Sequence, residues 1–90
     1  MYKLAYTAEA KSWIAHFNPR IQRQLKSAIE RLAQKPDIGK RLTDELSDYW
    51  SYRTGDYRII YQIHHKQVLV LIVTVGNRKE IYKIMSRKLL

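Results

Sequence analysis

The chain has no cysteine, only three glycines and two prolines, and few acidic side chains. The absence of cysteine excludes disulfide bonds and thiolate metal sites, so packing or a partner must stabilise the fold. The longest apolar run, Val68 to Val75, has eight residues, far fewer than the roughly 20 that cross a bilayer. No signal-like hydrophobic segment follows Met1. We therefore expect a soluble, cytoplasmic protein that does not associate with membranes.

Hydrophobic residues make up 46% of the 90-residue chain and charged residues 28%, a composition typical of globular proteins. We expect a single domain, residues 1–90, with a small core. Seventeen basic residues against eight acidic ones give a net charge of +9. Residues 50–90 hold eight basic and two acidic side chains, so the excess lies mostly in this half. Such a field attracts polyanions, although charge alone does not distinguish a nucleic-acid partner from a soluble basic surface.

Hydrophobic periodicity predicts an α+β fold with the element order β-α-α-β-β-β-α. The expected elements are a short strand over residues 2–6, a helix over 8–17 with Thr7 as N-cap, and a second helix from Asn18-Pro19 to Lys35-Pro36. Residues 37–48 have no clean period and are expected to form a loop that can include a turn of helix. The predicted architecture is a small, antiparallel-rich sheet with a two-helix hairpin packed on it.

The segment around Gly55-Asp56 predicts a β-hairpin with a type II′ turn, because glycine stands at the first turn position. This register places Arg53 directly opposite Arg58. Alternation separates a polar face from an apolar face that is expected to pack on the helices: Trp50, Tyr52, Tyr57, Ile59, Tyr61 and Ile63. Like charges opposite each other are destabilising, so the arginine pair indicates an anion site unless both side chains simply point into water.

Val68 to Val75 is apolar on both faces apart from Thr74, which predicts a central strand covered on each side. Arg78 and Tyr82 follow it at a spacing of four, which places them on one face if residues 78–88 are helical. A helical tyrosine is ordinarily a packing residue. The basic residues around Tyr82 favour a functional role instead.

Three segments together resemble a known family: GKRL, YWSYRTGDYRIIYQI and TVGNRKEIY, in this order after two helices and before a short basic tail. They resemble the RelE branch of the RelE/ParE toxin superfamily over essentially the whole chain. The resemblance implies a compact sheet flanked by helices, related in shape to small microbial ribonucleases. It also implies the toxin of a type II toxin–antitoxin pair, an endoribonuclease that cuts mRNA in the ribosomal A site and arrests translation.

Carried over by residue, the resemblance implies that Arg58 stabilises the transition state, that Arg78 binds phosphate and that Tyr82 lies near the attacking hydroxyl. Where relatives often have a further Lys or Arg, this chain has Ser51, which puts one backbone contact in doubt. The remaining candidates are assigned to substrate or ribosomal RNA. Substrate binding is expected of Arg53, Ser51, Lys79 and Lys83, and ribosomal RNA binding of Lys40, Arg41, Arg87 and Lys88.

Cleavage by a ribose 2′-OH requires a base, stabilisation of the phosphorane charge and help for the leaving 5′-oxygen. His16, His64 and His65 are expected to be exposed or packing residues, so Tyr82 is the expected base. Such a base is weak, and we therefore expect the ribosome to supply orientation. No metal or other cofactor is expected, because the acids are scattered and the cluster Asp44, Glu45 and Asp48 is typical of a solvated loop.

Two other functions remain open. One is a ParE-like inhibitor of DNA gyrase that does not cut RNA, since the two branches share the fold. The other is an RNA-binding module that has lost catalysis, for which Ser51 is the indication. In each toxin interpretation the family implies an acidic antitoxin, encoded adjacently, that forms a hetero-oligomer with this chain.

Overall fold

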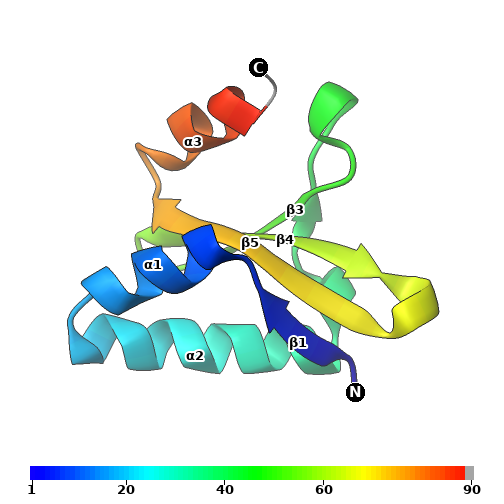
Figure 1. Cartoon of the computed structure of the whole chain (residues 1–90), viewed down its shortest axis with the longest axis horizontal. Helices are drawn as coiled ribbons and strands as arrows, with labels where there is room; N and C mark the ends of the chain where they lie inside the picture. The colour runs from blue at the N-terminus through cyan, green and yellow to red at the C-terminus, as the bar shows by residue number, and fades with distance from the viewer. Residues whose placement is uncertain (89–90) are drawn as a thin grey trace.

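The computed structural model describes residues 1–88, with only the backbone described for Lys88. The described chain forms a five-stranded mixed sheet in the order β1-β5-β4-β3-β2. Helices α1 and α2 lie together on one side of the sheet, and α3 lies on the other (Figure 1). The predicted α+β fold and its element order are confirmed.

The first half of the chain follows the predicted order. Strand β1 is Lys3–Tyr6, α1 is Ala8–His16 and α2 is Pro19–Gln34. The side chains of Thr7 and Asn18 cap the two helices by accepting hydrogen bonds from backbone N–H groups three residues on. The apolar stripe of α2 is buried against the sheet, as its spacing predicts: Leu25, Ala28, Ile29, Leu32 and Ala33.

The segment predicted as a loop contains helical turns, which the prediction allowed, and a strand, which it did not. It holds the 3₁₀ turns η1 (Pro36–Ile38) and η2 (Asp44–Leu46), and between them the strand β2 (Lys40–Arg41). A strand of two residues has no period of its own, because its pairing with β3 defines it. The sequence pattern therefore missed β2.

The hairpin is confirmed in detail. Strands β3 (Trp50–Thr54) and β4 (Tyr57–His64) pair antiparallel, with Arg53 opposite Arg58. Gly55 has a φ of 60°, while Asp56 is not among the residues with positive φ, which fits the type II′ turn. Both arginines accordingly lie on the same face of the sheet.

Strand β5 (Leu69–Asn77) is an interior strand of the sheet and lies between β4 and the parallel edge strand β1. The predicted strand began one residue too early: Val68 has a left-handed φ of 52° in the turn that follows η3 (His65–Gln67). Both faces of β5 are covered, as expected. Val70, Ile72 and Val75 belong to the core under α1 and α2, while Val73 belongs to a second core under α3.

Tyr61 joins the sheet to the β2 segment. Its hydroxyl donates to the carbonyl oxygen of Pro36 at 2.6 Å, and burial raises the pKa of this phenol to about 12. A side chain at Gly39 would place its Cβ 2.3 Å from this hydroxyl and 2.9 Å from the Ser51 carbonyl oxygen. Glycine is therefore required where the chain passes over Tyr61.

Helix α3 is Ile81–Lys88 and so begins later than predicted. Residues 78–80 form a turn instead. Arg78 therefore lies outside the helix, and the expectation that Arg78 and Tyr82 share one helical face is wrong. Within residues 1–88, none of the helices combines the length and the apolar character that crossing a membrane requires.

Candidate functional site

A hollow of about 170 Å³ lies on the face of the sheet that α3 covers. Three of the predicted site residues line it: Ser51 from β3, Arg58 from β4 and Tyr82 from α3. The apolar part of its wall comes from β4, α3 and the segment around η2: Leu42, Leu46, Ile60, Ile81 and Met85. A cation and a phenol that are 24 positions apart in sequence thus meet at one hollow.

Arg58 lies in β4 and is half-buried. Its Nη1 donates to the Ser51 hydroxyl at 3.4 Å, and its Nε is buried with no hydrogen-bond partner among the described residues. A buried N–H group without a partner costs free energy. Because Arg58 lines the hollow, its guanidinium group can offer donors to an oxyanion that enters it.

Tyr82 borders the hollow from above and is 58% exposed. Its neighbours Ile81 and Met85 are buried and attach α3 to the sheet over Ile60 and Val73. Gly76 allows this close packing, because an added Cβ would lie 3.2 Å from the Ile81 Cδ1. The Tyr82 phenol is therefore open to solvent at the rim of the hollow, and its helix is held in place by the buried Ile81 and Met85.

The turn between β5 and α3 is ordered by Asn77. Its Oδ1 accepts from the backbone N–H groups of Lys79 at 3.1 Å and Glu80 at 2.9 Å. The backbone N–H of Arg78 donates to the Asp56 carbonyl oxygen at 3.0 Å, which ties the turn to the tip of the hairpin. Asn77 was not among the predicted site residues. An asparagine side chain that accepts from backbone N–H groups two and three residues on stabilises a turn, and asparagine is common in turns for this reason.

The other predicted substrate residues surround the hollow without lining it. Arg53 is exposed, and its Nε donates to the Gly55 carbonyl oxygen at 3.2 Å. Arg78 is exposed at the same end of the sheet. The basic residues of the last segment, Lys79, Lys83 and Arg87, are exposed as well. The side chain of Lys88 lies outside the described residues.

Lys40 and Arg41, which were both predicted to bind ribosomal RNA, lie on opposite faces of the sheet edge. Lys40 pairs with Ser51 and Arg41 with Trp50. Because cross-strand partners share a face, Lys40 lies on the face of the hollow, whereas Arg41 lies on the side of the helices. The Arg41 Nε donates to the Ser47 carbonyl oxygen at 2.8 Å. Both residues are exposed, and their assignment to ribosomal RNA stays a prediction.

The histidines lie away from the hollow. His16 contacts the Ser12 carbonyl oxygen in α1, and His64 contacts Gln62. His65, at the far end of the hairpin formed by β4 and β5, contacts the Tyr2 hydroxyl at 3.0 Å. Within residues 1–88, no cluster of three His, Cys, Asp or Glu side chains could hold a metal ion.

Comparison with known proteins identifies the family. The model of the family described as the ParE toxin of type II toxin–antitoxin systems matches residues 4–82. The chain belongs to the RelE/ParE toxin family. The toxin RelG of Mycobacterium tuberculosis is 32% identical over 84 residues, which cover 91% of this chain and 97% of RelG. A putative RelE-like toxin protein of Escherichia coli is 23% identical over 98% of this chain and 97% of its own length.

Solved toxins of the family have the same fold. The RelBE2 toxin–antitoxin complex of M. tuberculosis contains a chain that is 32% identical, with a TM-score of 0.79 over 86% of this toxin and 98% of that chain. The isolated E. coli RelE toxin gives a TM-score of 0.75 at 23% identity, with both chains fully covered. This chain is thus a type II toxin with a RelE-like fold.

Proposed function

We propose that this toxin is a ribosome-dependent, metal-independent endoribonuclease that cuts mRNA by attack of a ribose 2′-OH on the adjacent phosphodiester. The observation that supports this proposal best is the shared hollow of Arg58 and Tyr82. Its volume, about 170 Å³, is below the roughly 300 Å³ at which pockets for whole small ligands begin. The hollow thus suits one group of a larger ligand, such as the scissile phosphate of an RNA strand.

In this mechanism Tyr82 accepts the proton of the 2′-OH as the oxygen attacks phosphorus. Arg58, which lines the hollow, stabilises with its guanidinium the charge that gathers on the phosphorane oxygens. Breakage of the bond to the 5′-oxygen then leaves a 2′,3′-cyclic phosphate, and the 5′-oxygen takes up a proton. Arg78 and Arg53 bind flanking phosphates at the exposed end of the sheet, with Lys79 and Lys83 beside them.

The exposure of Tyr82 supports the proposed dependence on the ribosome. A phenol that is 58% exposed does not hold its substrate in an enclosed pocket. The RNA must therefore be aligned by another body, and alignment contributes a large share of the barrier reduction in such reactions. A ribosomal substrate would also place the toxin in the cytoplasm, with ribosomal RNA contacts at Lys40, Arg87 and Lys88.

The proposed partner that restrains the toxin is an acidic antitoxin, encoded adjacently, which forms a hetero-oligomer with this chain. Two observations support it: the excess of nine positive charges, and the presence of antitoxins in the solved complexes of M. tuberculosis, E. coli and Pyrococcus horikoshii relatives. An acidic partner complements such a surface.

Single-turnover cleavage on programmed ribosomes tests the proposal. Replacing Tyr82 by Phe or Arg58 by Ala should each lower the cleavage rate by about 100-fold or more, as loss of a base or of an oxyanion donor does. Lys66→Ala, at the exposed turn η3, is the control and should cleave normally. Unchanged cleavage by Tyr82→Phe would exclude Tyr82 as the base.

The second candidate is gyrase inhibition, which the ParE name of the matching family model favours. A supercoiling assay separates the two functions. The nuclease predicts codon-phased mRNA cuts and normal gyrase activity. Inhibited supercoiling without cuts would establish the gyrase inhibitor, whereas neither effect would leave an RNA-binding module.

A further inference from the structure

Strand β5 contains a β-bulge about halfway along its pairing with β4. Ile60 pairs with Thr74, whereas the next residue of β4, Tyr61, pairs with Ile72. Val73 is therefore an extra residue in β5 relative to β4. Because side chains alternate along a strand, one extra residue exchanges the two faces of every position beyond it.

The bulge determines which residue of β5 lies beside the arginine of the hollow. In the observed register Arg58 pairs with Gly76. Without the extra residue, each pairing beyond the bulge would change by one position, and Val75 would lie opposite Arg58 on the face that α3 covers. A Cβ at Gly76 would already lie 3.2 Å from the Ile81 Cδ1, so the branched side chain of a valine would hold α3 away from the sheet. The bulge thus lets the helix that carries Tyr82 pack beside Arg58.

Thr7, between β1 and α1, holds the bulge from the other edge of β5. Its backbone N–H donates to the Ile72 carbonyl oxygen at 3.0 Å, and its hydroxyl donates to the Val73 carbonyl oxygen at 2.5 Å. Successive carbonyl groups of a regular strand point to opposite edges, so two successive acceptors on the β1 side are a feature of the bulge. The same hydroxyl accepts from the Ala10 N–H at 3.0 Å. One side chain that both donates and accepts therefore joins β1, α1 and the bulge.

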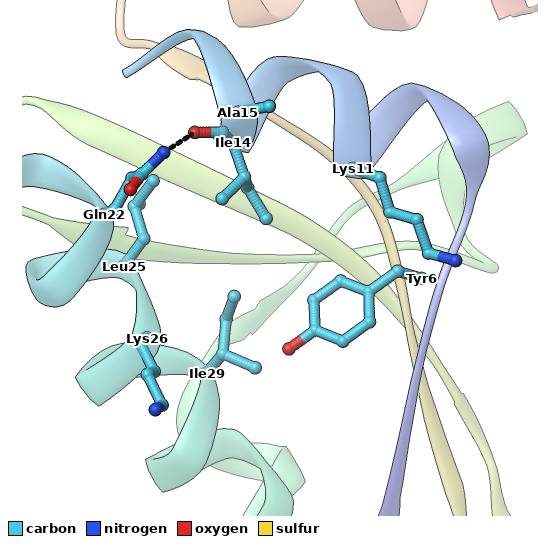
Figure 2. Close-up of a pocket in the computed structure, with 8 residues that line it drawn as sticks. All are labelled: Tyr6, Lys11, Ile14, Ala15, Gln22, Leu25, Lys26 and Ile29. Carbon is cyan, nitrogen blue, oxygen red and sulfur yellow. Dashed lines mark hydrogen bonds between the residues drawn. The ribbon is translucent and has the colours of Figure 1, made fainter. Parts of the chain in front are cut away.

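The position of Thr7 is itself fixed by packing on either side of it. The ring of Tyr6, the preceding residue, packs on the core under α1 and α2, and Figure 2 shows it turned toward Ile29 of α2. Helix α1, which follows Thr7, is tied to α2 by a hydrogen bond of 2.9 Å from the Gln22 Nε2 to the Ile14 carbonyl oxygen (Figure 2). The Thr7 hydroxyl therefore meets β5 at a fixed place.

We propose that Thr7 is a positioning residue of the candidate nuclease site. Its hydroxyl fixes the extra residue Val73, and the shifted register keeps Gly76 opposite Arg58 under α3. Thr7 is not one of the described residues that line the hollow, so its effect on cleavage passes through β5. The catalytic consequence rests on the proposed function, whereas the role of Thr7 in the register does not.

Three variants separate the donor of the Thr7 hydroxyl from its acceptor. Thr7→Val keeps the shape of the side chain and removes both. Thr7→Asp keeps an acceptor that caps α1, but its carboxylate cannot donate to the Val73 carbonyl oxygen. Thr7→Ser keeps both. Asn18→Ala is the matched control, because it removes the corresponding cap of α2, the hydrogen bond from the Ile21 N–H.

Amide hydrogen exchange of the ¹⁵N-labelled full chain measures the effect on the bulge. Thr7→Val and Thr7→Asp should each raise exchange at residues 74–77 and in α3 by about tenfold or more, because a buried carbonyl group then lacks its donor. Thr7→Asp should leave exchange in α1 unchanged, and Thr7→Ser should resemble the wild type throughout. Asn18→Ala should raise exchange at the start of α2 only. The dispersion of the amide spectrum verifies that each variant is folded, and Thr7→Asp carries the test if Thr7→Val is not.

Single-turnover cleavage on programmed ribosomes measures the effect on the site. At saturating ribosomes, Thr7→Val and Thr7→Asp should each lower the rate by about tenfold or more, since small displacements of aligned groups have large effects on rate. The ribosome concentration at half saturation should hardly change, because exposed residues such as Arg53 still bind RNA. Thr7→Ser and Asn18→Ala should cleave at rates close to that of the wild type.

Three results would overturn the proposal. They are wild-type exchange at residues 74–77 in Thr7→Asp, the same exchange pattern in Asn18→Ala as in Thr7→Asp, and faster exchange in Thr7→Asp with cleavage at the wild-type rate. The last result would leave the nuclease proposal standing. A wild-type chain that does not cut mRNA would instead refute the nuclease proposal, while the exchange measurements would still decide whether Thr7 fixes the bulge.

Discussion

At the scale of single residues, Ser51 differs most from its expected role. It was predicted to bind substrate at a position where relatives have a cation, yet it is only 5% exposed, and its hydroxyl accepts a hydrogen bond from Arg58. A lysine or arginine has no acceptor to offer at this position. Its small size also leaves space beside the arginine. We therefore expect Ser51 to act through Arg58, by fixing the orientation of the guanidinium.

Tyr61 provides a prediction about pH. Burial, with a smaller contribution from the nearby Asp37 charge, raises its pKa from 10 to about 12. The neutral phenol is thus favoured in the fold, and its stabilisation is complete below pH 10 and lost as pH rises towards 12. We expect the free energy of unfolding of the wild type to fall more steeply over this range than that of Tyr61→Phe.

Urea denaturation at intervals between pH 8 and pH 12 measures the difference. Tyr61→Phe should be less stable at pH 8, because it loses the hydrogen bond to Pro36. The gap should narrow by up to about 2–3 kcal/mol towards pH 12, since each pKa unit corresponds to about 1.4 kcal/mol. A constant gap would mean that the phenol is not the group that titrates.

At the scale of elements, the position of α3 depends on the turn that precedes it. Asn77→Ala removes the acceptor for the N–H groups of Lys79 and Glu80. Loss of a hydrogen bond of this kind costs about 1 kcal/mol, and here it loosens the turn that leads into α3. We therefore predict faster amide exchange throughout α3 and slower mRNA cleavage, because Tyr82 is then less well held.

Ser86→Ala is the matched control within α3. It removes only a hydrogen bond from the exposed Ser86 hydroxyl to the Tyr82 carbonyl oxygen, so exchange and cleavage should hardly change. Native-state hydrogen exchange followed by NMR measures the first effect, and the ribosomal assay measures the second. Equal exchange in the two variants would contradict the role given to Asn77.

How well the sequence predicts a helix or strand depends on how regular its repeat of apolar residues is. Helix α2 and the hairpin of β3 and β4 have a clear apolar repeat, so their faces and even the pairing of Arg53 with Arg58 were predictable. Strand β2 and the start of α3 were not predictable. Strand β2 is defined by the pairing of Lys40 with β3, and the start of α3 follows the turn that the Asn77 side chain stabilises. These depend on contacts that periodicity does not contain.

The same limit applies to the site. Arg58, Ser51 and Tyr82 were predicted, but Leu42 and Leu46, which help to line the hollow, lie in the segment interpreted as a loop. Their burial against Ile60 and Met85 arises only when η2 packs under α3. Hence sequence motifs identified the polar residues that line the hollow, whereas the apolar residues of its wall were found only in the structure.

At the scale of the whole molecule, the sheet separates two basic surfaces. Arg53 and Arg78 lie with the Arg58 hollow, while Arg20 and Arg23 lie on the side of the helices. Only the first surface should bind single-stranded RNA. Each phosphate contact contributes about 0.7 to the slope of log affinity against log salt for single strands. The double variant Arg53→Ala with Arg78→Ala should therefore reduce this slope by about 1.4.

Fluorescence anisotropy of a labelled RNA between 50 and 300 mM salt measures this slope. Arg20→Ala with Arg23→Ala removes the same net charge and should leave the slope nearly unchanged. If both double variants reduced it equally, RNA would be held by the overall field rather than by one face.

The pairing of β1 with β5 determines when the toxin becomes complete during its synthesis. Lys3 lies beside Leu69, and the strands between them cannot form the full sheet without β5. Since a chain is made from its N-terminus, β1 cannot pair with β5 until more than three quarters of these 90 residues have been made. Tyr82 is added later still. If the toxin acts on translating ribosomes as proposed, a nascent copy still lacks the complete site while β5 and Tyr82 are being added.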